Sequence, residues 1–399
     1  MVVVASDPGG ARDSGGLVGK IVGSGRRRLM TGGLTLSSVL VLGGLTACGE
    51  SGAGADGAGA SGSSDPQVCT PGEITYGEVD EEVAAAEVDE EALVVYSGRS
   101  EDLVAPLLEQ FTEETGIDLS VRYGNTAAMT AQLLEEGDQS PADFFLSQDA
   151  GALGALGNAG CLATLPEDTL DLVEDRYRAD DDNWVAVTGR ARVIVLNPDL
   201  VAESDRPTGI GDVLDQRWSG QVGIAPSNAS FQSFVTAIRV LEGEDAAREF
   251  LDALVANEVQ TYEGNGDVLA AVNSGEISLG LINHYYLYEL AAEIGAENVV
   301  AENLFLEDGG AGSLVNISGA GVVTGTDRGE DAQALLDFML SETAQSYFAE
   351  TTFEYPMVDG IQQPAGLPSL QELSPPDLDL TDLDSLAQTL ALISEVGLI

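Results

Sequence analysis

Short apolar runs alternate with segments of helical periodicity over most of the chain, and this alternation constrains the fold more than any other feature. The apolar run at 93–98, which ends in Ser-Gly, precedes a stretch, 101–115, in which apolar residues recur every three or four positions. Further apolar runs follow at 119–123 and 142–146, with another helical segment between them. Strands joined through helices form parallel sheets, so the sequence predicts an α/β fold with a ligand crevice beyond the carboxyl ends of its strands.

The length of 399 residues predicts two lobes, because a single hydrophobic core seldom grows to that size. The β-rich run at 184–197 is long enough to cross from one lobe to the other, and 319–324 predicts a strand near the return. Helices are expected at 234–241, 245–256 and 331–340. The sequence contains no internal repeat and no phosphate-binding glycine loop of the P-loop or dinucleotide type.

The N-terminal region predicts export. Arginines at 26–28 precede a weakly apolar stretch that ends in Leu-Thr-Ala-Cys at 45–48, the pattern of a lipoprotein signal peptide. This stretch is too short and too rich in Gly and Ser to span a membrane as a stable helix. We expect residues 1–47 to be removed, Cys48 to carry a lipid, and 48–92 to form a flexible tether. The paired arginines leave the general secretory and twin-arginine routes both open.

Two further cysteines, Cys69 and Cys161, remain once Cys48 is assigned. Export places them in an oxidising compartment, where an even pair predicts a disulfide. Two unrelated buried thiols are the alternative. A metal site made of two thiols without a nearby histidine is not favoured.

The composition is strongly acidic, with 67 Asp and Glu against 16 Lys and Arg. Two of these acids and five of these bases precede residue 48, so cleavage leaves 65 acids, 11 bases and a net charge of −54. Such a surface repels nucleic acid, which is therefore not an expected partner. The acids are spread along the chain, and this spread favours adaptation to salt or a codon bias over a dedicated cluster for cations.

Hydrolytic chemistry finds little support in the sequence. The only histidine, His284, has no Gly-x-Ser-x-Gly elbow to accompany it, and no His-rich or Cys-rich cluster suggests a catalytic metal. An exported hydrolase that uses a carboxylate pair remains an alternative, but any pair among 65 acids is weak evidence. We therefore predict that the protein is not an enzyme.

Tyr285 and Tyr286 follow an apolar run directly. Adjacent tyrosines are usually core or interface aromatics, and the alternative is a pair of phenolate ligands. Phenolate is a hard anionic oxygen donor that suits a trivalent cation such as Fe(III). A phenol with a pKa near 10 ionises at neutral pH only where a strong positive charge stabilises the anion. A helix beginning at this pair would add to that stabilisation through its dipole.

Five segments occur in an order that is typical of one family. They lie at 93–100 (Leu-Val-Val-Tyr-Ser-Gly-Arg-Ser), 135–145 (with Ser-Pro-Ala-Asp), 184–193 (with Gly-Arg-Ala-Arg-Val), 281–286 (Leu-Ile-Asn-His-Tyr-Tyr) and 354–356 (Glu-Tyr-Pro). Together they resemble the ferric-iron-binding branch of the solute-binding proteins that serve bacterial ABC importers. The resemblance implies a two-lobed periplasmic-binding-protein (Venus flytrap) fold with a hinge of crossing strands.

The resemblance also implies the course of the chain through that fold. Lobe 1 would comprise 93–189 and 317–365, lobe 2 would comprise 190–316, and the tail 366–399 would pack on lobe 2. Fe(III) would be held in the cleft by Tyr285 and Tyr286 together with carbonate or phosphate as a synergistic anion.

Several polar residues match the anion or cleft positions of the family. Arg190 and, by a weaker match, Arg192 would hold a carbonate through charge-assisted hydrogen bonds, although a structural ion pair is their alternative. The other matched residues are Asn228, Ala229, Ser230, Asn265 and Asn283.

Three departures from the family pattern concern the iron ligands. Ser100, Gln148 and Asn228 stand where some members supply a histidine, a glutamate and a third tyrosine. Two protein ligands then remain, to be completed by water, the anion or a nearby side chain. The same fold binding another anion or a small organic solute, with the tyrosines stacking on it, is the alternative.

The resemblance implies a transport role outside the cytoplasm. The chain would be a monomeric lipoprotein, held by Cys48 on the outer face of the cytoplasmic membrane, that delivers iron to an ABC permease and its ATPase.

Overall fold

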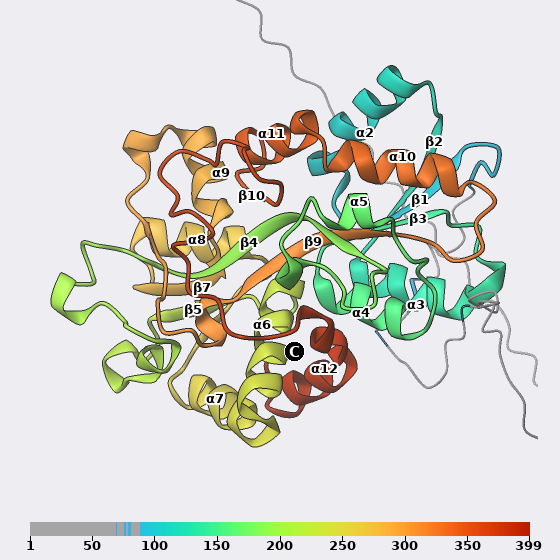
Figure 1. Cartoon of the computed structure of the whole chain (residues 1–399). Coiled ribbons are helices and arrows are strands. Elements are labelled where there is room, and N and C mark those ends of the chain that lie inside the picture. Colours follow the sequence, from blue (N-terminus) through green and yellow to red (C-terminus); the bar gives the residue numbers. More distant parts are fainter. Residues whose placement is uncertain (1–68, 70–75, 77–78, 81–87) are drawn as a thin grey trace, which may run out of the picture. The chain divides into compact units, whose positions relative to one another are not determined.

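The computed structural model describes residues 69, 76, 79–80 and 88–399, and all of them belong to one compact unit, Ser63–Ile399 (Figure 1). The expected signal peptide and the expected lipidation site Cys48 lie outside the described residues. None of the helices in the described part is long and apolar enough to cross a membrane.

Ten strands form the sheet at the centre of this unit, in the order β2-β1-β3-β9-β4-β7-β5-β6, with β8 and β10 attached to β4. The first three strands are parallel, as the alternating pattern predicts, whereas β9 runs antiparallel to β3. The strands are β1 (Leu93–Ser97), β2 (Leu119–Tyr123), β3 (Phe144–Ser147), β4 (Val185–Leu196), β5 (Val222–Ile224), β6 (Gln260–Thr261), β7 (Leu279–Asn283), β8 (Glu302–Leu304), β9 (Val315–Val322) and β10 (Tyr355–Pro356).

Strand β4, which the β-rich run at 184–197 predicts, changes its partner midway. From Val185 to Ala191 it pairs antiparallel with β9, and from Arg192 to Leu196 it pairs antiparallel with β7. Every residue of β4 is buried. One continuous strand therefore links the β1–β3 side of the sheet to the β5–β7 side.

Helices cover both faces of the sheet on each side of β4 (Figure 1). Helix α10 lies over β9 on one face and α4 lies against β9 on the other, while α8 and α6 both contact β7. The helices are α2 (Glu101–Thr115), α3 (Thr126–Glu136), α4 (Ala150–Asn158), α5 (Glu167–Leu170), α6 (Ala229–Glu242), α7 (Glu244–Ala256), α8 (Asn265–Ser274), α9 (Tyr285–Ile294), α10 (Gly329–Met339), α11 (Glu342–Glu350) and α12 (Leu386–Glu395).

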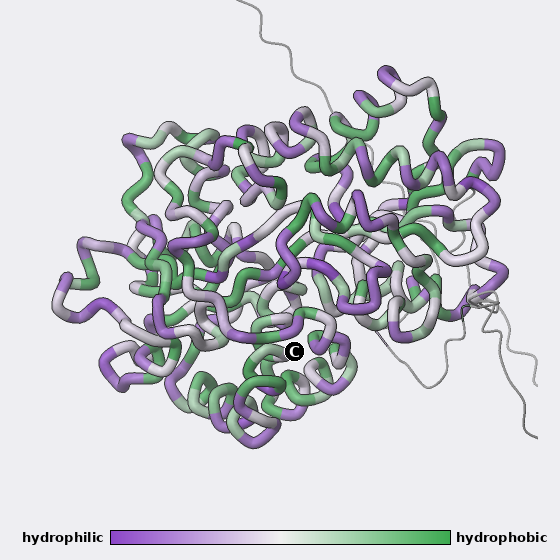
Figure 2. Tube along the Cα trace, in the orientation of Figure 1, coloured by the Kyte–Doolittle hydropathy of each residue, from purple (hydrophilic) through white to green (hydrophobic). Residues whose placement is uncertain are grey.

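Helix α2 shows how the sequence determines an element. Its buried residues, Val104, Leu107, Leu108 and Phe111, follow the helical spacing, and Gly116 ends the helix at a φ of 74°. Figure 2 shows the same division throughout, with apolar residues on the inner strands and hydrophilic residues on the outer loops.

Two residues from the stretch expected to be tether are packed on the folded body. Cys69 forms a disulfide with Cys161, the pair that the sequence predicts. Tyr76 is also buried, with 3% of its surface exposed. Both positions lie near α4, since Cys161 follows its C-terminal end and Tyr76 contacts Asp149 just before its first residue.

The C-terminal tail contacts both sides of β4 rather than one. Its 3-10 turn η8 (Leu380–Asp384) packs on α4, and α12 packs on α6. A Cβ at Gly154 of α4 would lie 2.5 Å from the Thr381 carbonyl oxygen, so the tail approaches a helix surface that only glycine leaves open. On α6, the Thr236 and Thr389 hydroxyl oxygens are 2.7 Å apart.

Candidate functional site

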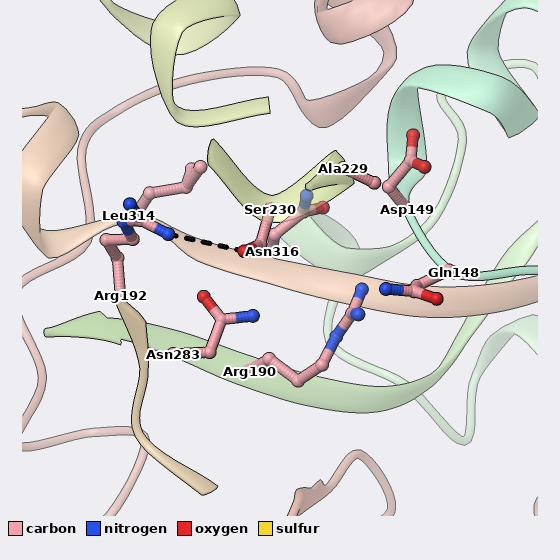
Figure 3. A pocket seen from close by; sticks show the side chains of 9 residues that line it. All are labelled: Gln148, Asp149, Arg190, Arg192, Ala229, Ser230, Asn283, Leu314 and Asn316. Carbon is pink, nitrogen blue, oxygen red and sulfur yellow. Dashed lines mark hydrogen bonds between the residues drawn. The ribbon is translucent and has the colours of Figure 1, made fainter. Parts of the chain in front are cut away.

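Helices α4 and α6 both begin at the edge of one polar pocket (Figure 3). The turn before α4 contributes Gln148 and Asp149, and the first turn of α6 contributes Ala229 and Ser230. Two helix N-termini beside one pocket favour an anionic ligand there. The full lining is Gln148, Asp149, Arg190, Arg192, Ala229, Ser230, Asn283, Leu314 and Asn316.

Arg192 is buried beside the first turn of α6. Its Nη2 donates to the Leu281 carbonyl oxygen over 2.8 Å, and its Nη1 donates to the Ser230 hydroxyl over 3.3 Å. Its guanidinium also lies 5.0 Å from the centre of the Phe234 ring. Burial lowers the pKa of Arg192 to about 9, so the group is still charged at neutral pH. Its Nε has no hydrogen-bond partner among the described residues.

Arg190 lies on the opposite side of Asn283 and belongs to a buried charge cluster (Figure 3). Its Nη2 donates to the Ile317 carbonyl oxygen over 2.7 Å, and its Nε is 3.7 Å from a Glu354 oxygen. Glu354 in turn accepts two hydrogen bonds from Arg99, of 2.9 and 2.8 Å. The structure thus contains the ion pair considered as the alternative for Arg190, and it also places Arg190 in the pocket lining.

Asn228, Ser230 and Asn265 form hydrogen bonds with one another at the start of α6. The Asn228 Oδ1 accepts from the Ser230 backbone N–H over 2.9 Å and from the Ser230 hydroxyl over 2.7 Å. The Asn265 Nδ2 donates to the same Ser230 oxygen over 2.9 Å. The Asn228 oxygen is therefore fully engaged in capping the helix, which argues against its acting as a metal ligand in place of a tyrosine.

Tyr285 and Tyr286 are the first two residues of α9, and their rings stack with centres 4.3 Å apart. Tyr285 is buried and Tyr286 is partly exposed. Burial raises the pKa of Tyr285 well above the ordinary value of 10, the neighbouring Tyr286 raises it further, and Arg190 acts in the opposite direction. The phenol is therefore neutral unless a cation stronger than an arginine side chain lies beside it.

His284 is held by both ring nitrogens in the interior. Its Nδ1 accepts from the Ala191 backbone N–H over 3.1 Å. A backbone N–H can only donate, so the proton sits on Nε2 and is donated to the Phe353 carbonyl oxygen over 2.9 Å. Burial lowers the pKa of His284 to about 4. A neutral imidazole with both ring nitrogens engaged provides no general base, so a histidine-dependent hydrolase is not supported.

The structure gathers most of the predicted cleft residues but not all of them. Asn283 and Gln148 line the pocket directly. Asn228 and Asn265 do not line it, but both form hydrogen bonds with the lining residue Ser230. Ser100 is exposed at the start of α2 and is not part of the lining. Tyr285 and Tyr286 do not line this pocket either; they follow its member Asn283 by two and three residues.

Sequence reasoning missed three of the polar residues in and around the pocket. Asn316 lies in a segment with no expected element, because β9 begins four residues before the predicted strand at 319–324. Arg99 and Glu354 were within recognised segments, but nothing in their local sequence shows that they pair.

Comparison with known proteins places the chain among solute-binding proteins. Residues 139–380 match the family model described as bacterial extracellular solute-binding protein. The Fe(3+)-binding periplasmic protein of Serratia marcescens is 32% identical over 317 residues, which cover 79% of this chain and 93% of that protein. The major ferric iron-binding protein of Neisseria meningitidis serogroup B is 30% identical over 310 residues, 77% of this chain and 93% of that one.

Solved structures agree in fold over the same extent. Iron-bound HitA from Pseudomonas aeruginosa superimposes with a TM-score of 0.72 at 34% identity, covering 77% of this chain and 99% of HitA. The Trichodesmium protein IdiA (FutA), solved with iron and citrate, gives a TM-score of 0.67 at 28% identity, covering 77% and 99%. These likenesses confirm the predicted α/β binding-protein fold.

Proposed function

The chain belongs to the family of bacterial extracellular solute-binding proteins that includes the ferric iron-binding periplasmic proteins, and on that premise we propose that it captures Fe(III) for an ABC importer. The protein binds its cargo and carries out no turnover, like the binding proteins it resembles. Its expected partners are a membrane permease and the ATPase of that permease.

The stacked pair Tyr285 and Tyr286 is the observation that carries this proposal. The two phenolate oxygens would supply two negative charges to a trivalent cation, and the start of α9 would stabilise both anions through its dipole. In the absence of the cation, burial keeps Tyr285 protonated, so the cleft does not accumulate unpaired charge.

A carbonate or phosphate ion would complete the site. The pocket between the starts of α4 and α6 offers Arg192, Ser230 and Asn283 as hydrogen-bond donors, with Arg190 opposite. The Trichodesmium structure, which has a similar fold, contains both iron and citrate, and citrate is an oxyanion. Because Asn228 is engaged as a helix cap, the remaining iron ligands are expected to be the anion, water or a nearby side chain.

Anchoring through Cys48 is part of the same proposal. A lipid on this cysteine would hold a monomeric protein on the outer face of the cytoplasmic membrane, next to its permease. Mass spectrometry of the membrane fraction should find an acylated Cys48 at the mature N-terminus. A soluble protein that begins at another residue would refute the anchor without affecting the iron site.

Replacing each tyrosine by phenylalanine tests the iron site. The wild-type protein should develop a phenolate-to-iron charge-transfer colour on addition of ferric ion, and Tyr285→Phe and Tyr286→Phe should each lose colour and affinity. Tyr288→Phe is the matched control, since Tyr288 lies on the same helix and its hydroxyl donates to the Gly366 carbonyl oxygen over 3.4 Å. If the double variant binds ferric ion as tightly as the wild type, the tyrosines are cleft-wall aromatics for another ligand.

A further inference from the structure

A tyrosine from outside the sheet and its helices reaches the edge of the pocket. The Tyr76 hydroxyl donates to the Asp149 Oδ1 over 2.7 Å, although the two residues are 73 positions apart. Tyr76 is 3% exposed and Asp149 is 6% exposed, so the bond is shielded from water. Asp149 is also a lining residue of the pocket.

Asp149 serves as the N-cap of α4, because the same Oδ1 accepts from the Ala152 backbone N–H over 3.1 Å. The charged or titratable groups that act on its carboxylate are Tyr76 and Arg190, and Asp384 of the tail lies near Tyr76. Tyr76 therefore supplies the only side-chain hydrogen bond that Asp149 accepts within the described residues.

The packing around this bond leaves little freedom. A Cβ at Gly151 would lie 2.9 Å from the Tyr76 hydroxyl oxygen and 2.2 Å from the Leu383 carbonyl oxygen. Glycine at this position of α4 is what lets the phenol and the tail approach together. The contact between Tyr76 and Asp149 therefore depends on the glycine in the first turn of α4.

The disulfide anchors the segment that carries Tyr76. Cys69 is joined to Cys161, three residues beyond the end of α4, whereas Tyr76 contacts the residue just before its start. A nine-residue helix is about 13 Å long. Cys69 and Tyr76 therefore contact the folded body near opposite ends of α4.

We propose that Tyr76, seven residues after the disulfide-bonded Cys69, is a positioning residue of the binding cleft: its hydroxyl holds the Asp149 carboxylate in the wall of the pocket that Arg190 also lines, and so sets how far into acid the cleft retains iron. This inference rests on the proposed function, since iron retention is its readout.

The physical basis is the charge state of Asp149. Burial raises the pKa of Asp149, and the Tyr76 hydrogen bond counters that rise by stabilising the carboxylate. Without the phenol, Asp149 takes up a proton at a higher pH. A neutral acid accepts the Ala152 backbone N–H less strongly than a carboxylate does, so the start of α4, which forms one wall of the pocket, would be held less firmly.

The experiment measures ferric ion affinity by competition with nitrilotriacetate between pH 5 and 8, in saturating inorganic phosphate so that the anion is not limiting. Tyr76→Phe keeps the ring and removes the hydroxyl, and it should move the acid midpoint of iron binding upward by about one pH unit. Tyr96→Phe is the matched control, because the buried Tyr96 hydroxyl also donates to a carboxylate, Glu136 at 3.0 Å, away from the pocket lining. It should lower the thermal midpoint and leave the pH profile of iron binding unchanged.

Two further arms separate positioning from a general loss of stability. In an Asp149→Asn background, adding Tyr76→Phe should cause no further shift of the profile, because the group that titrates is gone. Reducing the disulfide should shift the profile of the wild type and leave that of Tyr76→Phe unchanged, if the disulfide acts through Tyr76.

The outcomes that overturn the two proposals differ. A wild type that takes up no ferric ion overturns the proposed function, and with it the role of Tyr76 in iron retention. A protein that binds iron and keeps the wild-type profile after Tyr76→Phe overturns the inference about Tyr76 alone.

Discussion

Arg99 and Glu354 form a bidentate ion pair in the interior although 255 residues separate them in the sequence. Their side chains are only 3% and 1% exposed. The Thr352 hydroxyl donates to the same carboxylate over 2.9 Å, and Arg190 lies 3.7 Å from it. One carboxylate therefore faces two buried guanidinium groups, and it ties the loop after β1 to the start of β10.

Removing that carboxylate should be costly. We expect Glu354→Gln to lower the free energy of unfolding by about 3–5 kcal/mol, because Arg99 and Arg190 would stay buried without a counter-charge. Chemical denaturation of the iron-free protein measures this. Glu302→Gln removes one of the two carboxylates that pair with Arg206, in a partly exposed contact of 2.7 Å, and should cost no more than about 1 kcal/mol. Equal losses in the two variants would contradict the argument.

The same pair predicts a pH dependence of stability. Burial acts to raise the pKa of Glu354, but Arg99 and Arg190 outweigh it and leave the pKa below the ordinary 4.5. A carboxyl whose pKa is depressed on folding contributes stability above its unfolded pKa and loses it as pH falls through the folded pKa. The free energy of unfolding should therefore fall below about pH 4.5 more steeply in the wild type than in Glu354→Gln. Parallel acid curves would show that other groups dominate.

Arg192 is expected to govern the response to the anion. Arg192→Lys keeps a positive charge but loses the planar guanidinium group, whose two Nη atoms donate to the Ser230 hydroxyl and to the Leu281 carbonyl oxygen. We expect the phosphate concentration that supports half-maximal iron binding to rise about tenfold, the effect of losing one charge-assisted hydrogen bond. Titration of iron affinity against phosphate measures it, and Arg206→Lys, at an arginine outside the pocket lining, should leave the titration unchanged.

The disulfide should stabilise the exported protein. Its cysteines are 92 residues apart, and closing a loop of that size contributes about 4–5 kcal/mol in the chain-entropy model, an upper figure. Replacing Cys69 and Cys161 together by serine should lower the free energy of unfolding toward that extent. Alkylation of the unreduced mature protein should find neither thiol free, and two labelled cysteines would refute the pairing.

Salt should stabilise the fold. The net charge of −54 after cleavage implies strong self-repulsion, and about 0.1 M salt already screens exposed charges farther apart than about 10 Å. We expect the thermal midpoint of the iron-free protein to rise between low and molar KCl. A flat or falling midpoint would mean that the acidic residues have another role.

Local periodicity predicted the elements of this fold well. The expected strand at 119–123 coincides with β2, and the run at 184–197 contains β4 with one extra residue at each end. In β2 the apolar residues Leu119, Val121 and Tyr123 alternate with polar ones, and β4 is rich in valine and other apolar residues, so both segments are typical of strands. The strand expected at 319–324 is shifted, since the polar residues Asn316 and Ser318 interrupt the apolar residues at the start of β9.

Contacts between distant residues could not be read from the sequence. The Arg99–Glu354 pair and the Tyr76–Asp149 bond each join residues that no periodic pattern relates. The tail was expected on one lobe, but backbone contacts at Gly151 and Gly154 bring it onto α4 as well as α6. Such contacts depend on how elements pack, and a single sequence records only which residues could take part.

The change of partners within β4 separates two neighbouring arginines mechanically. Arg190 pairs with Asn316 of β9, whereas Arg192 pairs with Asn283 of β7. If the two sides of the sheet rotate against each other, the backbone rotation is concentrated in β4, at the single residue between these arginines. An oxyanion that contacts both arginines would resist this rotation. Its hydrogen bonds to them would therefore have to break before the two sides of the sheet could move apart.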